Sequence, residues 1–201
     1  DSHLQAARRK SRDLNGVVSR EHLWIPQYVT PIAQLPSYPR LSPTGKIRIN
    51  HLYALKFCEV AIVLEKWLMD LMRQLDGKSG VTQERAEEFA QEEEDHTTVF
   101  WMLLQASVPN RYRNGSGWLV GHSVPFWMTA LTRIPFFTLF WTFLALYCEE
   151  RFLTLNHLIS KSESIDPLHR AVHEYHFLEE VRHVSDGEKL WKAAIQGASP
   201  F

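Results

Sequence analysis

The distribution of proline and glycine constrains the fold of this chain more than any other feature. Five of its ten prolines lie between residues 26 and 43, where each fixes its own φ and removes a backbone donor. A long helix or a central strand is therefore excluded from that segment. We expect residues 1–44 to form a short N-terminal helix or coil and then an extended arm that lies on the domain.

Beyond the arm, four long segments have the periodicity of helices. From Lys46 to Asp76 the chain contains neither proline nor glycine, and apolar residues recur at helical spacing. Thr82 is a good N-cap for the second segment, and Asp166 followed by Pro167 is a strong start signal for the fourth. We predict helices over residues 46–76, 82–108, 135–164 and 167–196, with a loop over 110–117 and a short connecting helix within 118–132.

These elements predict an all-α protein, because no segment alternates as a strand would. Four long helices with short connections form a helix bundle, so we expect a single domain over residues 1–201, with the arm at 1–44 and the bundle at 45–196. Lys and Arg number 22 against 23 Asp and Glu, which leaves no basic field for nucleic acid. The longest apolar run, residues 134–148, is too short to span a bilayer. Two cysteines and no leader-like run favour a reduced, cytoplasmic protein.

Each of the four predicted helices places one glutamate on its apolar face. Two of these helices add a histidine three residues after the glutamate, and the last has another histidine four residues before it. Positions three, four and seven apart share one face of a helix. The residues concerned are Glu59, Glu93, His96, Glu149, His176, Glu180 and His183. Apolar neighbours such as Phe89 and Phe100 indicate that these polar groups face the core.

Burying four carboxylates costs several kcal/mol apiece unless something compensates them. The sequence offers no matching set of four inward-facing Lys or Arg residues. Two divalent metal ions would neutralise the four charges, and three neutral imidazoles would complete the ligand set. Carboxylate and imidazole ligands without thiolate favour iron or manganese over structural zinc. The pattern therefore predicts a dinuclear metal site inside the bundle.

Weaker interpretations exist for each part of the pattern. A single Glu-x-x-His pair is common by chance, and the acidic run Glu92–Asp95 is also typical of a solvated face. Two pairs on apolar stripes, with two further carboxylates, favour the metal site. Stripe position selects Glu149 over Glu150. Histidines on a helix are more often hydrogen-bonded core or surface residues than metal ligands. His173 lies one turn before His176 and could contact a metal-ligating side chain. The other histidines on the predicted helices are His51, His157, His169 and His173.

On these residues the sequence resembles the ferritin-like diiron carboxylate proteins, over roughly residues 46–195. Within that group it is most similar to the p-aminobenzoate N-oxygenase (AurF-type) family. In that family a His-x-x-x-Glu-x-x-His helix supplies a third imidazole to the dimetal site, and His176 matches that histidine. The resemblance implies a ferritin-like four-helix bundle with an additional short helix and an irregular Pro-rich N-terminal arm. It also implies a homodimer.

The resemblance implies an oxygenase that uses dioxygen as co-substrate to oxidise an aryl amine toward a hydroxylamine or nitro product. The cofactor would be two iron ions, with manganese–iron as the alternative. An external electron donor is expected, because the chain contains no flavin or nicotinamide fingerprint. Candidate partners for an acidic substrate group are Arg111, Arg113, Arg133 and Arg151. Two other classes share the metal site: a diiron C-hydroxylase or desaturase, and a non-enzymatic iron-binding protein of the ferritin type.

Overall fold

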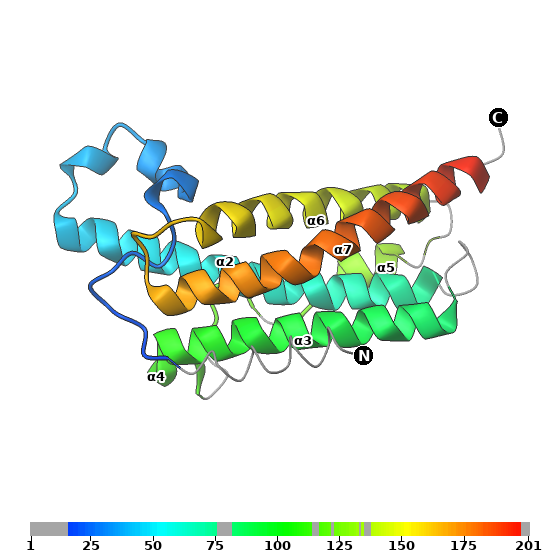
Figure 1. The fold of residues 1–201 in the computed structure, drawn as a ribbon, viewed down its shortest axis with the longest axis horizontal. Coiled ribbons are helices and arrows are strands. Elements are labelled where there is room, and N and C mark those ends of the chain that lie inside the picture. Colours follow the sequence, from blue (N-terminus) through cyan, green and yellow to red (C-terminus); the bar gives the residue numbers. More distant parts are fainter. Residues whose placement is uncertain are drawn as a thin grey trace.

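Four long helices run along the molecule and form the predicted bundle (Figure 1). The structure is a computed structural model that describes residues 16–75, 82–113, 117–121, 123–132, 134 and 138–197. The long helices are α2 (Pro43–Leu75), α3 (Gln83–Ser107), α6 (Thr138–Ser160) and α7 (Pro167–Gly197). Consecutive helices pair extensively, α2 with α3 and α6 with α7, and α7 also packs on α3. Within the described residues there is no strand, only an isolated bridge between Leu23 and Ile165. The prediction of an all-α ferritin-like bundle is confirmed.

The predicted helix starts have the expected caps. The Thr82 hydroxyl accepts a hydrogen bond from Arg85 N at 3.2 Å, which satisfies one of the free donors at the start of α3. Asp166 does the same for α7, where its Oδ1 accepts from Leu168 N and His169 N at 2.9 and 3.1 Å. Local polar residues therefore set both helix starts, and with them the register of the residues downstream.

The arm differs from the expected extended segment. It contains three short 3-10 turns, η1 (Gln27–Val29), η2 (Pro31–Gln34) and η3 (Tyr38–Arg40), and α2 begins at Pro43, inside the predicted arm. Prolines stand in the first turns of these elements, where the missing N–H has no intrahelical partner to lose. Proline thus starts helical turns here. The predicted N-terminal helix or coil falls on residues 1–15, outside the described residues.

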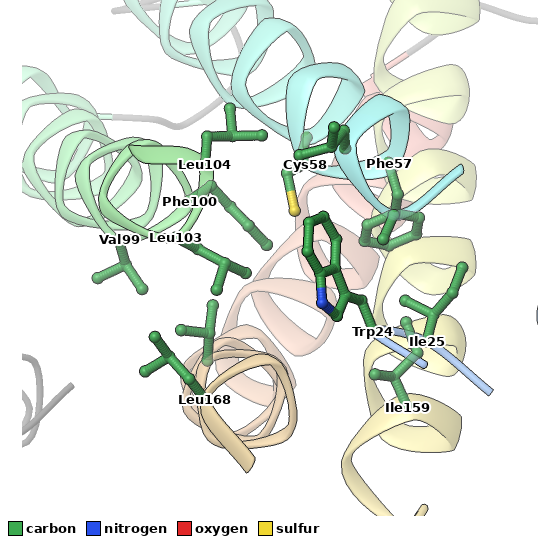
Figure 2. Packing of buried hydrophobic residues seen from close by; sticks show 14 of the residues in the cluster. Trp24, Ile25, Phe57, Cys58, Val99, Phe100, Leu103, Leu104, Ile159 and Leu168 are labelled. Carbon is green, nitrogen blue, oxygen red and sulfur yellow. The ribbon is translucent and has the colours of Figure 1, made fainter. Parts of the chain in front are cut away.

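The arm is anchored at one end of the bundle by buried polar contacts. Asn50 Oδ1 accepts from Trp24 N at 2.8 Å, and Asn50 Nδ2 donates to Ile25 O at 2.8 Å. The buried Trp24 ring stacks on the rings of His51 and His169, with centroid separations of 3.7 and 5.0 Å. Figure 2 shows Trp24 pointing into the core between Phe57 and the side chains of α3. The arm therefore closes the hydrophobic core at this end.

The connections also correct two predictions. The segment expected as loop contains α4 (Pro109–Tyr112), while the expected connecting helix is α5 (Phe126–Thr132). Helix α6 ends at Ser160 rather than Ser164. After this end the chain contacts the arm, where Asp166 N donates to Leu23 O at 2.8 Å. Residues 77–80, 114–116 and Pro135, which the predictions also covered, lie outside the described residues.

Two expectations about the whole chain are tested in part. Among the described helices, none combines the length and apolar character needed to cross a bilayer. Cys58 and Cys148 are both free thiols, and burial raises the pKa of the Cys58 thiol. Cys58 is thus a small core residue packed among apolar side chains, as its place in the sequence indicates.

Candidate metal centre

All four long helices bring ionisable side chains to one place inside the bundle. Ligand-type atoms of these residues form three overlapping groups, in each of which the atoms lie within 4.8 Å of one another. All members are buried, the most exposed being Glu149 at 7%. We call this set the Glu/His cluster; it comprises Glu65, Glu93, His96, Glu149, His176, Glu180 and His183.

Two glutamates of the Glu/His cluster lie between its histidines. His96 Nδ1 is 3.0 Å from Glu93 Oε2 and 2.9 Å from Glu180 Oε1. His183 Nδ1 is 2.9 Å from Glu93 Oε1 and 3.3 Å from Glu180 Oε2. Each carboxylate therefore faces one imidazole with one oxygen and the second imidazole with the other. Both Glu-x-x-His pairs direct their glutamate and their histidine to the same point, as the spacing predicts.

The third histidine, His176, lies near the same Glu180 oxygen as His96. His176 Nε2 is 3.4 Å from Glu180 Oε1 and 3.2 Å from Glu65 Oε1. Glu149, from α6, joins Glu65 and Glu93 in the remaining group. Its neighbour Glu150 is exposed, so the choice of Glu149 by stripe position agrees with the geometry.

Several buried oxygens of the cluster make no hydrogen bond, although imidazole nitrogens lie near three of them. They are Glu65 Oε2, Glu93 Oε1, Glu149 Oε1 and both oxygens of Glu180. Among the described side chains no Lys or Arg is buried, so neither of these permanent cations neutralises the acids. Buried carboxylates without donors or counter-charges are strongly unfavourable. The donor set, four carboxylates and three imidazoles, fits two divalent cations in charge and in ligand type.

In the metal-free protein, bound protons reduce the negative charge of the cluster. Burial, followed by repulsion from neighbouring carboxylates, raises the pKa values of Glu65 and Glu149 well above normal. Burial lowers the pKa of His96, but the charge of Glu180 and the hydrogen bond with Glu93 outweigh it and raise that pKa to about 10. The metal-free cluster therefore holds protons near pH 7. Metal binding must displace them, which couples metal affinity to pH.

An additional carboxylate orients one of the histidines. His183 Nε2 donates to Glu92 Oε2 at 2.8 Å, while Arg182 Nη2 lies 2.7 Å from the other oxygen, Glu92 Oε1. With Nε2 engaged in this way, His183 Nδ1 faces the Glu/His cluster. Such carboxylate partners fix the tautomer and orientation of metal-binding histidines. The sequence analysis considered Glu92 only as part of a solvated acidic run, although it is the residue directly before Glu93.

The structure does not bring Glu59 to the cluster. This side chain is 0% exposed, but its oxygens accept hydrogen bonds from Tyr112 OH at 2.7 Å and from the backbone N of Leu119 and Val120, both to Oε2, at 2.7 and 2.6 Å. Glu59 thereby anchors the segment after α4 to α2. The α2 member of the cluster is Glu65, which the sequence analysis missed.

A signal for Glu65 was present in the lengths of the helices. Glu65 lies ten residues before the end of α2 at Leu75, and Glu93 lies ten residues after the start of α3 at Gln83. In an antiparallel helix pair, equal distances from the connection place two residues at the same level. Glu59 is six residues farther along, which is about 9 Å at the rise of an α-helix. Both glutamates lie on buried faces, so periodicity alone did not separate them.

Of the arginines considered for an acidic substrate group, the three that the structure describes form no ion pair with the Glu/His cluster and are not fully buried. Arg113 and Arg151 are exposed, Arg111 is partly buried beside Tyr112, and Arg133 is outside the described residues.

Three comparisons with known proteins were made. A family model described as "P-aminobenzoate N-oxygenase AurF" matches residues 12–201, nearly the whole chain. The comparisons with curated proteins and with solved structures found no match.

Proposed function

Because this chain belongs to the p-aminobenzoate N-oxygenase AurF family, we propose that it is an oxygenase with a pair of iron ions that N-oxygenates an aromatic amine. The observation that carries the proposal is the position of His176. Its Nε2 faces Glu65 and Glu180 inside the cluster, where it adds a third imidazole to four carboxylates. This is the ligand set that the resemblance to the family implies, except that Glu65 stands in place of Glu59.

The seven side chains of the Glu/His cluster would hold the two ions. Glu180 faces His96 and His176 with one oxygen and His183 with the other, so it would contribute to holding the ions together with all three histidines. Bound iron would supply the binding and reductive activation of dioxygen. The protein supplies a buried site in which Glu92 orients His183 and in which Phe89 and Phe100 help to exclude water. A manganese–iron pair would use the same ligands.

The reaction needs a reductant that the chain does not contain. Conversion of a primary amine to a hydroxylamine inserts one oxygen atom of O2 into an N–H bond. The second oxygen atom leaves as water, and this consumes two electrons and two protons. An electron-donor protein or a small reductant must provide the electrons. The amine is a small molecule; a homodimeric assembly and a cytoplasmic location remain predictions.

The test begins with anaerobic reconstitution with Fe(II), followed by metal analysis. We expect about two iron ions per chain, by the charge count of the cluster. Exposure to ¹⁸O₂ with a reductant and a panel of aryl amines should then place the label on nitrogen. Glu180→Gln, which removes the charge of the carboxylate that faces all three histidines of the cluster, is the matched inactive control. One tightly bound zinc without iron uptake would contradict the proposal.

The same experiment separates the other two classes that share this metal site. Label on a ring carbon would identify a C-hydroxylase, and loss of two hydrogens without label would identify a desaturase. Oxidation of many iron ions per chain with no organic product would identify an iron-storage protein. Each of these results would overturn N-oxygenation while leaving the metal centre in place.

A further inference from the structure

The hydrogen bonds of His173 define which of its ring nitrogens carries the hydrogen. This residue lies on α7 one turn before His176 and is 0% exposed. Asn156 Nδ2 donates to Phe152 O at 2.8 Å, so the Asn156 Oδ1 atom, 2.6 Å from His173 Nδ1, must be the acceptor. His173 Nδ1 therefore carries the hydrogen. Burial lowers the pKa of His173 to about 3, so the ring is neutral near pH 7 and Nε2 keeps its lone pair.

This lone pair has no partner in the structure. His173 Nε2 is buried and makes no hydrogen bond, which is an unfavourable state for an acceptor. Aromatic rings lie around it: the His173 ring is 5.4 Å from that of Phe57 and 5.9 Å from that of Phe100. Figure 2 shows both phenylalanines turned toward the interior, one from α2 and one from α3. The acceptor thus sits among apolar rings that could pack against an aromatic molecule.

The same rings connect His173 to the Glu/His cluster. The ring of Phe100 is 4.7 Å from that of His176 as well as 5.9 Å from that of His173. Three residues of α-helix separate the two histidines by about 4.5 Å along the axis. A small molecule that reached His173 Nε2 would therefore lie beside the metal centre. Among the described side chains no Lys or Arg is buried, so neither residue type offers its charge to an acidic substituent in this core.

We propose that His173 is a positioning residue for the substrate: its Nε2 accepts a hydrogen bond from the N–H of an aromatic amine whose ring packs against Phe57 and Phe100. The inference rests on the proposed function and deepens it by assigning a residue to the amine group. An acceptor binds an amine through a hydrogen and so leaves the nitrogen lone pair free to react. It also prefers amines that have an N–H over tertiary amines.

The experiment combines a change in the protein with a change in the ligand. Iron-loaded protein without oxygen is titrated with aniline and with N,N-dimethylaniline, which has no N–H. We expect the native protein to bind aniline more tightly, and His173→Phe to lose about tenfold of that preference, the typical effect of one neutral hydrogen bond. Because the steric difference between the ligands is present in both proteins, the ratio of the two preferences isolates the hydrogen bond. Metal content should stay unchanged.

His169→Phe is the matched control. His169 is also fully buried on α7, and its Nδ1 also lacks a partner, but it lies one turn farther from the cluster beside Trp24. This variant should keep the native preference for aniline. His173→Gln retains an acceptor and should restore part of the preference, so the test survives if His173→Phe does not fold. An equal preference in native protein and His173→Phe, or an equal loss in His169→Phe, would overturn the assignment.

Binding and turnover separate this proposal from the proposed function. If aniline binds with the N–H preference but no oxygen reaches nitrogen under O2, the role of His173 stands and N-oxygenation fails. If N-oxygenation proceeds and His173→Phe leaves the KM for aniline unchanged, the role of His173 fails and N-oxygenation stands. In native protein the ¹⁵N resonance of His173 Nε2 should move on addition of aniline but not of N,N-dimethylaniline. A resonance unaffected by aniline would also overturn the assignment.

Discussion

Glu59 and Glu65 lie on the same helix, less than two turns apart, and are equally buried at 0% and 1% exposure. Their surroundings differ completely. Glu59 accepts hydrogen bonds from one hydroxyl and from backbone N–H groups, whereas Glu65 faces other acids and His176, and its Oε2 has no donor. Burial therefore does not distinguish an anchor from a candidate ligand. The supply of hydrogen-bond donors does.

The same distinction holds on α7. Asp166 is buried, and its oxygens accept from the backbone N of Ser19, Leu168 and His169. Glu180, four turns along the helix, is equally buried but has no hydrogen-bond partner on either oxygen. One region of the interior thus satisfies its acids with protein donors. The other gathers acids whose charges only cations or protons can balance.

Metal removal should change the free energy of unfolding more than any single substitution. It affects the Glu/His cluster and leaves the hydrogen-bonded acids Glu59 and Asp166 as they are. The chelated protein leaves several acids facing one another in the core. If the metals are present at about a thousand times their Kd, chelation should lower the free energy of unfolding by about 4 kcal/mol. Urea denaturation of iron-loaded and chelated protein at pH 7 measures the difference. Superimposable denaturation curves would contradict a buried metal centre.

Paired substitutions on α2 test the comparison directly. Glu65→Gln removes an anionic ligand candidate, so the iron content should fall from about two per chain to one or less. Glu59→Gln should leave the iron content at two but lower the free energy of unfolding by about 1–3 kcal/mol, because it weakens the anchor of residues 119 and 120. Metal analysis and urea denaturation of both variants provide the measurements. The reverse pattern would make Glu59 the ligand and Glu65 the anchor.

Periodicity predicted much of this molecule because its information is local. The four long helices, the caps at Thr82 and Asp166 and both Glu-x-x-His pairs depend on residues within one or two turns. The periodicity indicated Glu59 and did not point to Glu65, although both lie on buried faces. Only the level of each residue in the antiparallel pair separates them. That level depends on where helices end. Sequence patterns locate helix ends less well than helix faces.

The features that the sequence did not predict depend on contacts between segments that are distant in the chain. The arm was expected to be extended, but its prolines begin 3-10 turns and the first turn of α2. Asp166, between α6 and α7, is held by Leu23 and Ser19 of the arm, which are more than 140 residues away in the chain. Glu92 and His183 are 91 residues apart in the chain. No short-range pattern could have paired them.

A smaller loss of metal binding is expected at Glu92, which is not a member of the Glu/His cluster but accepts a hydrogen bond from His183. Glu92→Gln keeps the size of the side chain but removes the charge that faces His183 Nε2. We expect a 10–100-fold loss of metal affinity, as is usual for partners that orient a metal-binding histidine. Competition with a chromophoric chelator measures it. Glu94→Gln, on an exposed position of the same helix, is the control and should bind metal as the native protein does. Equal affinities of the two variants would remove Glu92 from the site.

The smallest effect concerns His169, which lies next to Asp166 at the start of α7, in the region whose acids have protein donors. Burial, followed by repulsion from His173 and His51, holds the pKa of His169 well below its usual value of 6.5. Below pH 6.5 the unfolded chain therefore binds a proton that the folded chain does not, and folding loses stability as the pH falls. The loss approaches 1.4 kcal/mol per pH unit. Above pH 6.5 this group adds no pH dependence.

His169→Phe should remove this component and flatten the dependence of stability on pH below 6.5. Its free energy of unfolding at pH 8 should be lower than that of the native protein, because the hydrogen bond with Ser107 at 3.0 Å is lost. Urea denaturation of iron-loaded protein from pH 8 to pH 5 measures both changes, and the two curves should converge as the pH falls. Curves that stay parallel over this range would mean that folding does not suppress protonation of His169. The polar groups around Trp24 would then accommodate charge, and this end of the core would differ less from the Glu/His cluster than the hydrogen bonds indicate.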